Sequence, residues 1–237
     1  MPVQSISDIL LRTHYCRVFL FASLLITLIY GIRNFSVLKD LKVFFWYLLL
    51  DFCLLCITIP IEPFNLLDDQ STNRFYGAIN GLVSVTELVV YYIYLNPVKL
   101  LGKRYNLVLL SLITIALFVV ISNISMRYPF DLSLAIDSYS LSAAIFLIIL
   151  PIALLNLFTI LKNDHLHSLN HESEFWITIG VLFYCALSSP YYYLRGSFQL
   201  NHYLQLIFDE VLFYTPFIIN CICILIAFIC RKQAKKS

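Results

Sequence analysis

The chain has 237 residues, of which 60% are hydrophobic and only 13% are charged, and its mean hydropathy is +0.84. Ordinary globular domains are about 45–50% apolar and about 25% charged, so a soluble protein of this size would lack the charges to cover its surface. With a formal net charge of only +2, the composition excludes a soluble enzyme and a nucleic-acid-binding protein and predicts an integral membrane protein.

Seven apolar stretches follow one another along the chain, most of them close to the length of about 20 residues that a membrane-spanning helix needs. They do not alternate between apolar and polar residues as transmembrane β-strands do, so we expect an all-α fold. No basic segment or small-residue cleavage site marks the first stretch as a signal peptide. We predict one transmembrane domain over residues 1–237, with helices at about 15–32, 43–60, 76–96, 106–124, 140–161, 174–194 and 204–230.

Lysine and arginine are divided unequally between the two ends of these helices. Because cytoplasmic loops retain Lys and Arg, the division predicts a multi-pass protein of the cell membrane with its N-terminus outside and its C-terminus in the cytoplasm. The inner end has Arg33, Lys39, Lys42, Lys99, Lys103, Arg104, Lys162, Arg231, Lys232, Lys235 and Lys236, and the outer end has Arg12, Arg17, Arg74, Arg127 and Arg195.

Residues with catalytic or metal-binding potential do not form a known motif. The seven cysteines lie in or beside predicted helices, and their odd number does not indicate a disulfide framework. His165, His167 and His171 share one loop, but their spacing matches no standard zinc site. No nucleophile elbow, His-Glu-x-x-His motif or phosphate-binding loop is present. We therefore predict no catalytic residues and no metal site.

Two acidic residues lie near the middle of predicted helices. Asp51 and Glu87 are each eight or nine residues from the inner end of their helix, which is about 12–14 Å at 1.5 Å per residue. Acids at this depth in a membrane are costly and usually functional. Two ionised carboxylates side by side would cost several kcal/mol, so we expect that Asp51 and Glu87 face one another and that at least one holds a proton at neutral pH.

Polar side chains recur at helical spacing around these acids, which predicts a polar cavity inside the bundle. Its expected ligand or proton site consists of Asp51, Glu87, Tyr47, Asn80 and Tyr91. Further polar stripes are Cys16, Ser23, Thr27, Tyr30 and Asn34; Thr178, Cys185, Ser189 and Tyr192; and His202, Gln205, Asp209, Pro216 and Asn220. The alternative for the hydroxyl and amide groups is that they bond one another between helices, at about 0.6 kcal/mol each.

A second polar group lies near the outer end of the last predicted helix. It consists of His202, Asp209 and Glu210, close to Arg195 at the end of the sixth helix. We interpret it as an outer mouth for a small polar or cationic ligand. The alternative is that these acids are simply hydrated at the membrane surface.

Helices two and six share a register that indicates an internal repeat. Trp46 and Trp176 lie at their starts, and Pro60 and Pro190 each follow fourteen residues later. A uniform offset would pair helices one to three with five to seven and leave the fourth as a linker, as in parallel-repeat transporters. The alternative is that both tryptophans belong to the aromatic belt of a membrane protein.

Seven helices in a 3+1+3 plan resemble the architecture of SWEET and PQ-loop transporters and of opsin-type receptors. The resemblance covers the whole chain, but in topology alone, and no functional residue carries over. The Pro-Gln dipeptide of the PQ-loop proteins is absent. The last helix, 204–230, has no lysine that could form a retinal Schiff base, so no cofactor is expected.

Two functions fit this pattern. The first is a seven-helix sensor or receptor for a small molecule, which signals through a cytoplasmic partner at the basic loops Lys39–Lys42 and Lys99–Arg104. The alternative is a small-solute or proton-coupled transporter in which Asp51 and Glu87 carry the proton. Either protein has the lipid bilayer as a partner and no nucleic acid, while homo-oligomerisation stays open.

Overall fold

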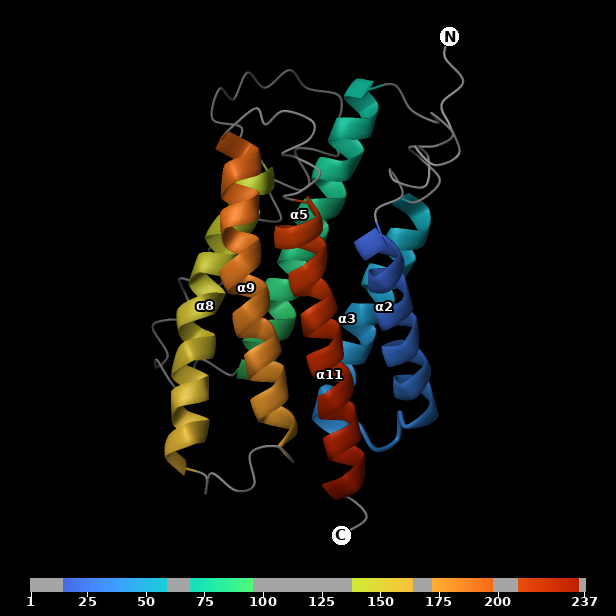
Figure 1. Ribbon diagram of the computed structural model, residues 1–237, viewed down its shortest axis with the longest axis vertical. Helices are drawn as coiled ribbons and strands as arrows, with labels where there is room; N and C mark the ends of the chain where they lie inside the picture. The colour runs from blue at the N-terminus through green and yellow to red at the C-terminus, as the bar shows by residue number, and fades with distance from the viewer. Residues whose placement is uncertain (1–14, 59–68, 96–137, 164–171, 198–208, 235–237) are drawn as a thin grey trace.

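The computed structural model describes residues 15–58, 69–95, 138–163, 172–197 and 209–234, and within them the fold is all-helical without strands (Figure 1). The α-helices are α2 (Tyr15–Arg33), α3 (Lys42–Thr58), α5 (Asp69–Leu95), α8 (Ser138–Asn163), α9 (Ser173–Ser197) and α11 (Thr215–Ala234). A 3-10 turn, η1 (Lys39–Leu41), precedes α3, and a π-helix, η3 (Asp209–Tyr214), precedes α11.

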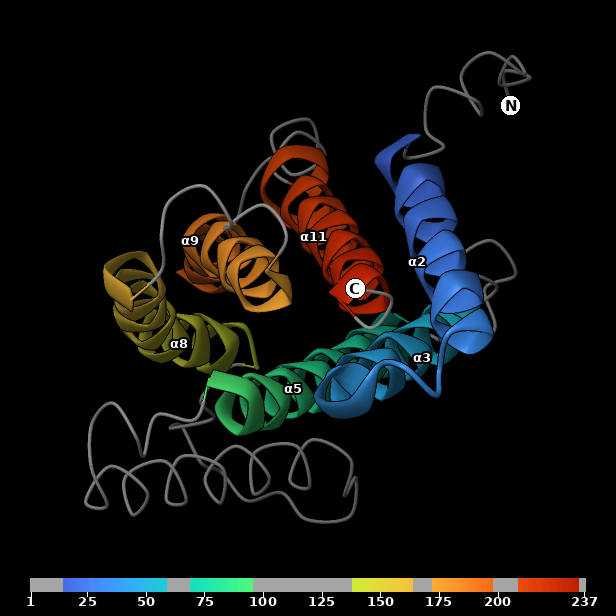
Figure 2. The ribbon, with the colours of Figure 1, turned by 90° about the horizontal axis from the view of Figure 1, so that it is seen from below.

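These six α-helices form a ring in which each helix packs against two neighbours. The order around the ring is α2, α3, α5, α8, α9 and α11, and α11 contacts α2 again (Figure 2). We call α2, α3 and α5 the N-terminal half and α8, α9 and α11 the C-terminal half. The two halves meet at two seams, α5/α8 and α11/α2, and the helices of each half run down, up and down in Figure 1.

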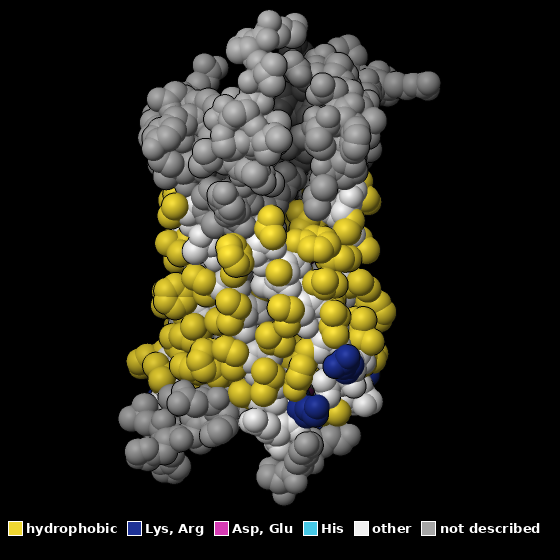
Figure 3. All heavy atoms as spheres, turned by 45° about the vertical axis from the view of Figure 1, so that its right-hand side comes forward, with side chains coloured by type: hydrophobic (Ala, Val, Ile, Leu, Met, Phe, Trp, Pro, Cys, Tyr) yellow, Lys and Arg dark blue, Asp and Glu magenta, His cyan; other side chains and the backbone are white. Residues whose placement is uncertain are grey.

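Three segments are long and apolar enough to cross a membrane by length and composition, namely Ser142–Lys162, Ser173–Leu194 and Val211–Ala234. Val18–Arg33 and Gly81–Leu95 are shorter apolar helices. Large apolar side chains, such as Ile26 on α2 and Ile222 on α11, are exposed on the outer surface. The face in Figure 3 has a belt of such side chains, with Lys and Arg below it. This surface is compatible with a membrane protein.

Every lysine and arginine side chain that the structure describes lies at one end of the ring, where α2, α5, α8 and α11 finish and α3 and α9 begin. They are Arg33, Lys39, Lys42, Lys162, Arg231 and Lys232. We call this the basic end. Asp40 of η1 forms an ion pair there with Arg231 of α11.

Two helices differ from the predicted ranges by four or more residues at one end. α5 begins at Asp69 instead of residue 76, because the helix continues beyond its apolar part. The stretch 204–230 is described from Asp209 as η3 and then as α11, which ends at Ala234. Pro216 has no N–H to donate to the preceding turn and needs room for its ring, which fits the wider π turn before it. The predicted helix 106–124 lies outside the described residues.

Candidate functional site

Glu87 of α5 is fully buried and joins the two halves of the ring. Its Oε1 atom accepts a hydrogen bond of 2.9 Å from the Tyr47 hydroxyl and one of 2.7 Å from the Tyr184 hydroxyl. Tyr47 lies on α3 in the same half, whereas Tyr184 lies on α9 in the other half. One carboxylate oxygen of Glu87 therefore accepts a hydrogen bond from a phenol hydroxyl of each half of the ring.

A second hydrogen bond between the halves lies one helical turn further along α5. Asn220 of α11 donates from Nδ2 to the Tyr91 hydroxyl at 3.0 Å. Gly180 of α9 allows this arrangement, because a Cβ at its position would lie 2.8 Å from Cβ of Cys223 and 2.9 Å from Oδ1 of Asn220. The absence of a side chain at Gly180 thus lets α9 and α11 approach closely around Asn220.

Asp51 lies one turn after Tyr47 on α3 and is only 7% exposed. Among the described residues, neither of its carboxylate oxygens has a hydrogen-bond partner, and the same holds for Oε2 of Glu87. Asp51 is close enough to Glu87 and to Cys221 of α11 to interact with both electrostatically. Buried acceptors without a donor are costly, so these three oxygens are where the interior favours a proton or a ligand.

Aromatic rings pack against the three tyrosines of this cluster. The Tyr47 and Tyr91 ring centroids are 6.2 Å apart, and the Tyr184 ring lies 5.2 Å from Phe146 and 5.6 Å from Phe217. All five side chains are buried. This packing fixes the directions of the phenol groups, because buried side chains in a dense interior have little freedom to rotate.

The cluster lies far from the described basic side chains. Glu87 precedes the last residue of α5 by eight positions, which places it about 12 Å from the basic end. No lysine or arginine side chain described by the structure lies at this depth. Among the residues that the structure describes, the carboxyl groups of Asp51 and Glu87 therefore have no basic side chain at their level.

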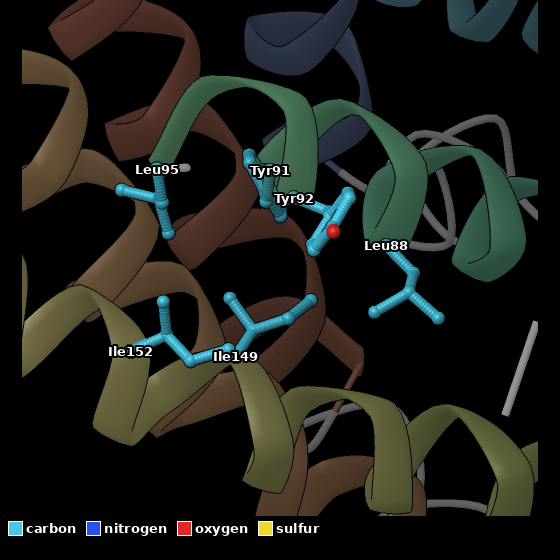
Figure 4. Close-up of a pocket in the computed structure, with 6 residues that line it drawn as sticks. All are labelled: Leu88, Tyr91, Tyr92, Leu95, Ile149 and Ile152. Atoms are coloured by element: carbon cyan, nitrogen blue, oxygen red, sulfur yellow. The ribbon is translucent and has the colours of Figure 1, made fainter. Parts of the chain in front are cut away.

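A small apolar groove at the α5/α8 seam is separate from these carboxyl oxygens. In Figure 4, side chains from α5 and α8 point toward one another across it. Its lining residues are Leu88, Tyr91, Tyr92, Leu95, Ile149 and Ile152. A cavity volume of about 10 Å³ leaves room for no more than about one water molecule.

The structure brings four of the residues predicted for the interior site together. Asp51, Glu87, Tyr47 and Tyr91 are all buried inside the ring. Asn80 lies on α5, but its side chain is outside the described part. For the hydroxyl and amide groups, the described contacts include bonds between helices, such as the 2.6 Å contact between the Ser84 and Ser142 hydroxyls and the Asn156–Thr178 bond of 2.9 Å.

The predicted outer mouth is not described in the same detail. His202 lies outside the described residues. Arg195 belongs to α9, and Asp209 and Glu210 belong to η3, but their side chains are not described. The grouping of these four residues stays a prediction.

Sequence reasoning missed Tyr184. The predicted stripe on this helix contained its neighbour Cys185, and nothing in the sequence distinguishes Tyr184 from the other fifteen of the 16 tyrosines. Only the position of α9 across the ring from α5 selects it.

Comparisons of the chain with protein families, with curated proteins and with solved structures gave no match.

Proposed function

We propose that the protein is a proton-coupled transporter of a small solute, in which Glu87 and Asp51 carry the proton. The observation that carries this proposal is the buried Glu87 carboxyl, which accepts phenol hydrogen bonds from both halves of the ring. Hydrogen bonds to an ionised carboxylate are roughly twice as strong as those between neutral groups. Protonation of Glu87 therefore weakens its bond to Tyr184 and loosens one half from the other.

The proposed protein spans the cell membrane seven times, with its N-terminus outside and its basic end in the cytoplasm. The positions of the described helix ends support this topology. α5 ends at the basic end and α8 begins at the opposite end, so the proposal includes one further span in the segment between them, residues 96–137. This segment is longer than the about 20 residues that one span needs.

The helices of the two halves follow one another in the same directions, which supports a transport mechanism. Both halves run down, up and down, and each contacts the other in the same way, since the last helix of one half meets the first helix of the other. Parallel repeats of this kind in small transporters move against each other around a site near the middle of the membrane. In the proposed protein, the Glu87–Tyr184 and Tyr91–Asn220 bonds belong to such a site.

Proton movement in reconstituted liposomes tests the proposal. A pH-sensitive dye inside the vesicles reports proton flux when single solutes, such as alkali cations, amines, amino acids and sugars, are added outside. We expect that one class drives proton flux in the wild type and that Glu87→Gln reduces this flux at least tenfold. Glutamine keeps the size of the side chain and still accepts both phenol bonds, so the fold should survive.

Glu174→Gln is the matched control, because Glu174 lies exposed in the first turn of α9 and the same atoms change. This variant should transport like the wild type. Undiminished flux in Glu87→Gln would remove Glu87 from the mechanism. If no solute drives flux, the transporter proposal fails, and the sensor predicted from the sequence, with a cytoplasmic partner at the basic end, becomes the better explanation.

A further inference from the structure

Three carboxylate oxygens in the interior of the ring have no described hydrogen-bond donor. Tyr47 and Tyr184 both donate to the Oε1 atom of Glu87, and Asn220 donates to the Tyr91 hydroxyl. Both oxygens of Asp51 and Oε2 of Glu87 are left without a described donor. An ionised carboxylate can only accept, so these oxygens require either a proton or a cation.

The described residues around the two carboxyl groups supply no positive charge. The other titratable groups near the two carboxyls come from four helices. They are Tyr47 of α3, Tyr91 of α5, Tyr184 and Cys185 of α9, and Cys221 of α11. Phenols and thiols of this kind are neutral at pH 7. The described polar neighbours on α2 and α8, Ser23 and Ser142, do not titrate in this range. When the pair is ionised, its compensating charge must come from outside the chain's described residues.

The kind of cation follows from the ligand atoms and the packing. Carboxylate oxygens are hard ligands and suit hard cations. The Tyr47 and Tyr184 hydroxyls bond Glu87, and their rings pack against Tyr91 and Phe146 with centroids 6.2 Å and 5.2 Å apart. This close packing favours a bare ion over an organic amine. A monovalent ion can replace one proton without changing the charge of the interior.

We infer that Asp51 and Glu87 form a binding site for an alkali-metal cation, Na⁺ or K⁺, which competes with protons for the same carboxylate oxygens. Asp51 supplies two oxygens from α3 and Glu87 supplies Oε2 from α5, while Oε1 keeps its two phenol bonds. This inference rests on the proposed function and names the ion that the transporter exchanges for a proton. At low pH both carboxyls are protonated, and at high pH the cation takes the place of one proton.

Thermal unfolding of the purified protein tests the site directly. A ligand that binds only the folded state raises the unfolding temperature in proportion to the logarithm of its concentration above the Kd. Melting is measured at pH 8.5 and pH 5.5 in NaCl, KCl, CaCl₂ or choline chloride at equal ionic strength. We expect Na⁺ or K⁺ to raise the unfolding temperature at pH 8.5 by about 3 °C over choline, and to have no such effect at pH 5.5.

Asp51→Asn and Glu87→Gln should each abolish the cation-specific shift, and the control Glu174→Gln should keep it. Binding of radioactive ²²Na⁺ or ⁸⁶Rb⁺ to the wild type, and its displacement by lowering the pH, gives a second measurement that needs no variant. Identical melting in Na⁺, K⁺ and choline at pH 8.5 would overturn the inference. So would a shift that survives Asp51→Asn, or stabilisation by Ca²⁺ alone.

The two proposals fail in different ways. Proton flux driven by another solute, without any stabilisation by Na⁺ or K⁺, would leave the transporter intact and remove the cation site. Stabilisation by Na⁺ or K⁺ that depends on Asp51 and Glu87, without flux in liposomes, would keep the cation site and remove the transporter.

Discussion

The two seams between the halves are built from different contacts. Beside the α11/α2 seam, Arg231 of α11 pairs with Asp40 of η1, the turn that follows α2, and the Lys232 ammonium lies 5.5 Å from the centre of the Tyr30 ring of α2. At the α5/α8 seam, apolar side chains face one another across the groove of Figure 4, and the Ser84 hydroxyl bonds with Ser142. Both seams are also packed in their interior, since the Thr27 hydroxyl of α2 bonds the Cys221 carbonyl of α11 at 3.4 Å. The difference is that the α11/α2 seam adds the described charged contacts at the basic end.

This difference indicates where the ring opens. The side chains of Arg231 and Asp40 are 32% and 48% exposed, and exposed ion pairs are worth only about 0–1 kcal/mol. Close van der Waals contact holds the packed interior of both seams and is lost over the whole interface when helices separate. Opening is therefore least costly at the end where the described contacts are exposed charges. We therefore expect the α11/α2 seam to open at the basic end while the α5/α8 seam acts as the hinge.

Locking each seam in turn should have the largest effect. The first lock is a reducible bismaleimide that links Asp40→Cys to Arg231→Cys, in a variant without the exposed Cys53 and Cys56. This cross-link should stop transport until it is reduced, because it holds the opening seam closed. Proton flux in the liposome assay, before and after reduction, measures the effect. We expect at least a tenfold loss that reduction reverses.

The matched lock lies at the other seam. The Ser84 and Ser142 hydroxyl oxygens are 2.6 Å apart, so cysteines in their place bring two sulfur atoms close to the disulfide length of about 2.05 Å. This double variant should form a disulfide on oxidation and keep at least half of its transport. Equal losses from both locks would contradict the hinge.

Much of the ring could be predicted from the sequence, because hydrophobic periodicity depends only on neighbours along the chain. Asp51 and Glu87 are buried because the turn spacing places them with Tyr47 and Tyr91 on inward faces. The start of α5 at Asp69 could not be predicted from hydropathy, since a helix can extend past its apolar part into polar sequence. The π turn before Pro216 also gave no signal in hydropathy, although the proline marks its place.

The two phenol bonds to Glu87 differ in whether they join the halves of the ring. Tyr184 and Tyr47 donate to the same oxygen atom, but only Tyr184 belongs to the other half. Tyr184→Phe should favour the open state by about 1 kcal/mol, or about fivefold in population, since hydrogen bonds between membrane helices are worth about 0.6–1.7 kcal/mol. Tyr47→Phe removes a bond within one half and should leave this population unchanged.

Spin labels on either side of the α11/α2 seam measure the opening. Ser36 and Gln233 are both exposed near the basic end, so Ser36→Cys and Gln233→Cys can carry the labels, and pulsed electron resonance gives the distance distribution between them. A larger long-distance fraction in Tyr184→Phe alone supports the role of the bond between the halves. An equal rise of the long-distance fraction in Tyr184→Phe and Tyr47→Phe would show that losing either phenol bond to Glu87 has the same effect on opening.

There is a physical reason why the sequence did not predict the role of Tyr184. A stripe on one helix predicts which side chains face inward, but the partner of an inward side chain depends on how helices far apart in the chain pack. Asp51 and Glu87 have a shared depth in their helices, whereas Tyr184 and Glu87 are 97 residues apart and meet across the ring. The same limit applies to Ser84 and Ser142, which meet only because α5 packs against α8.

The smallest expected effect concerns the Asp40–Arg231 ion pair. Arg231→Gln should raise the open fraction at the α11/α2 seam by no more than about fivefold, because an exposed pair contributes at most about 1 kcal/mol and Lys232 keeps its contact with the Tyr30 ring. Screening should produce a similar change in the wild type, since the Debye length falls from about 30 Å at 0.01 M salt to about 3 Å at 1 M. Choline chloride is the salt to use, because it separates screening from binding of alkali cations at Asp51 and Glu87.

The charge-swapped variant Asp40→Arg/Arg231→Asp restores an ion pair with the opposite order of charges, so it should return the distance distribution toward that of the wild type. If Arg231→Gln and the swapped variant open the seam equally, the arginine acts there through packing of its side chain, and the charge difference between the seams does not decide which one opens.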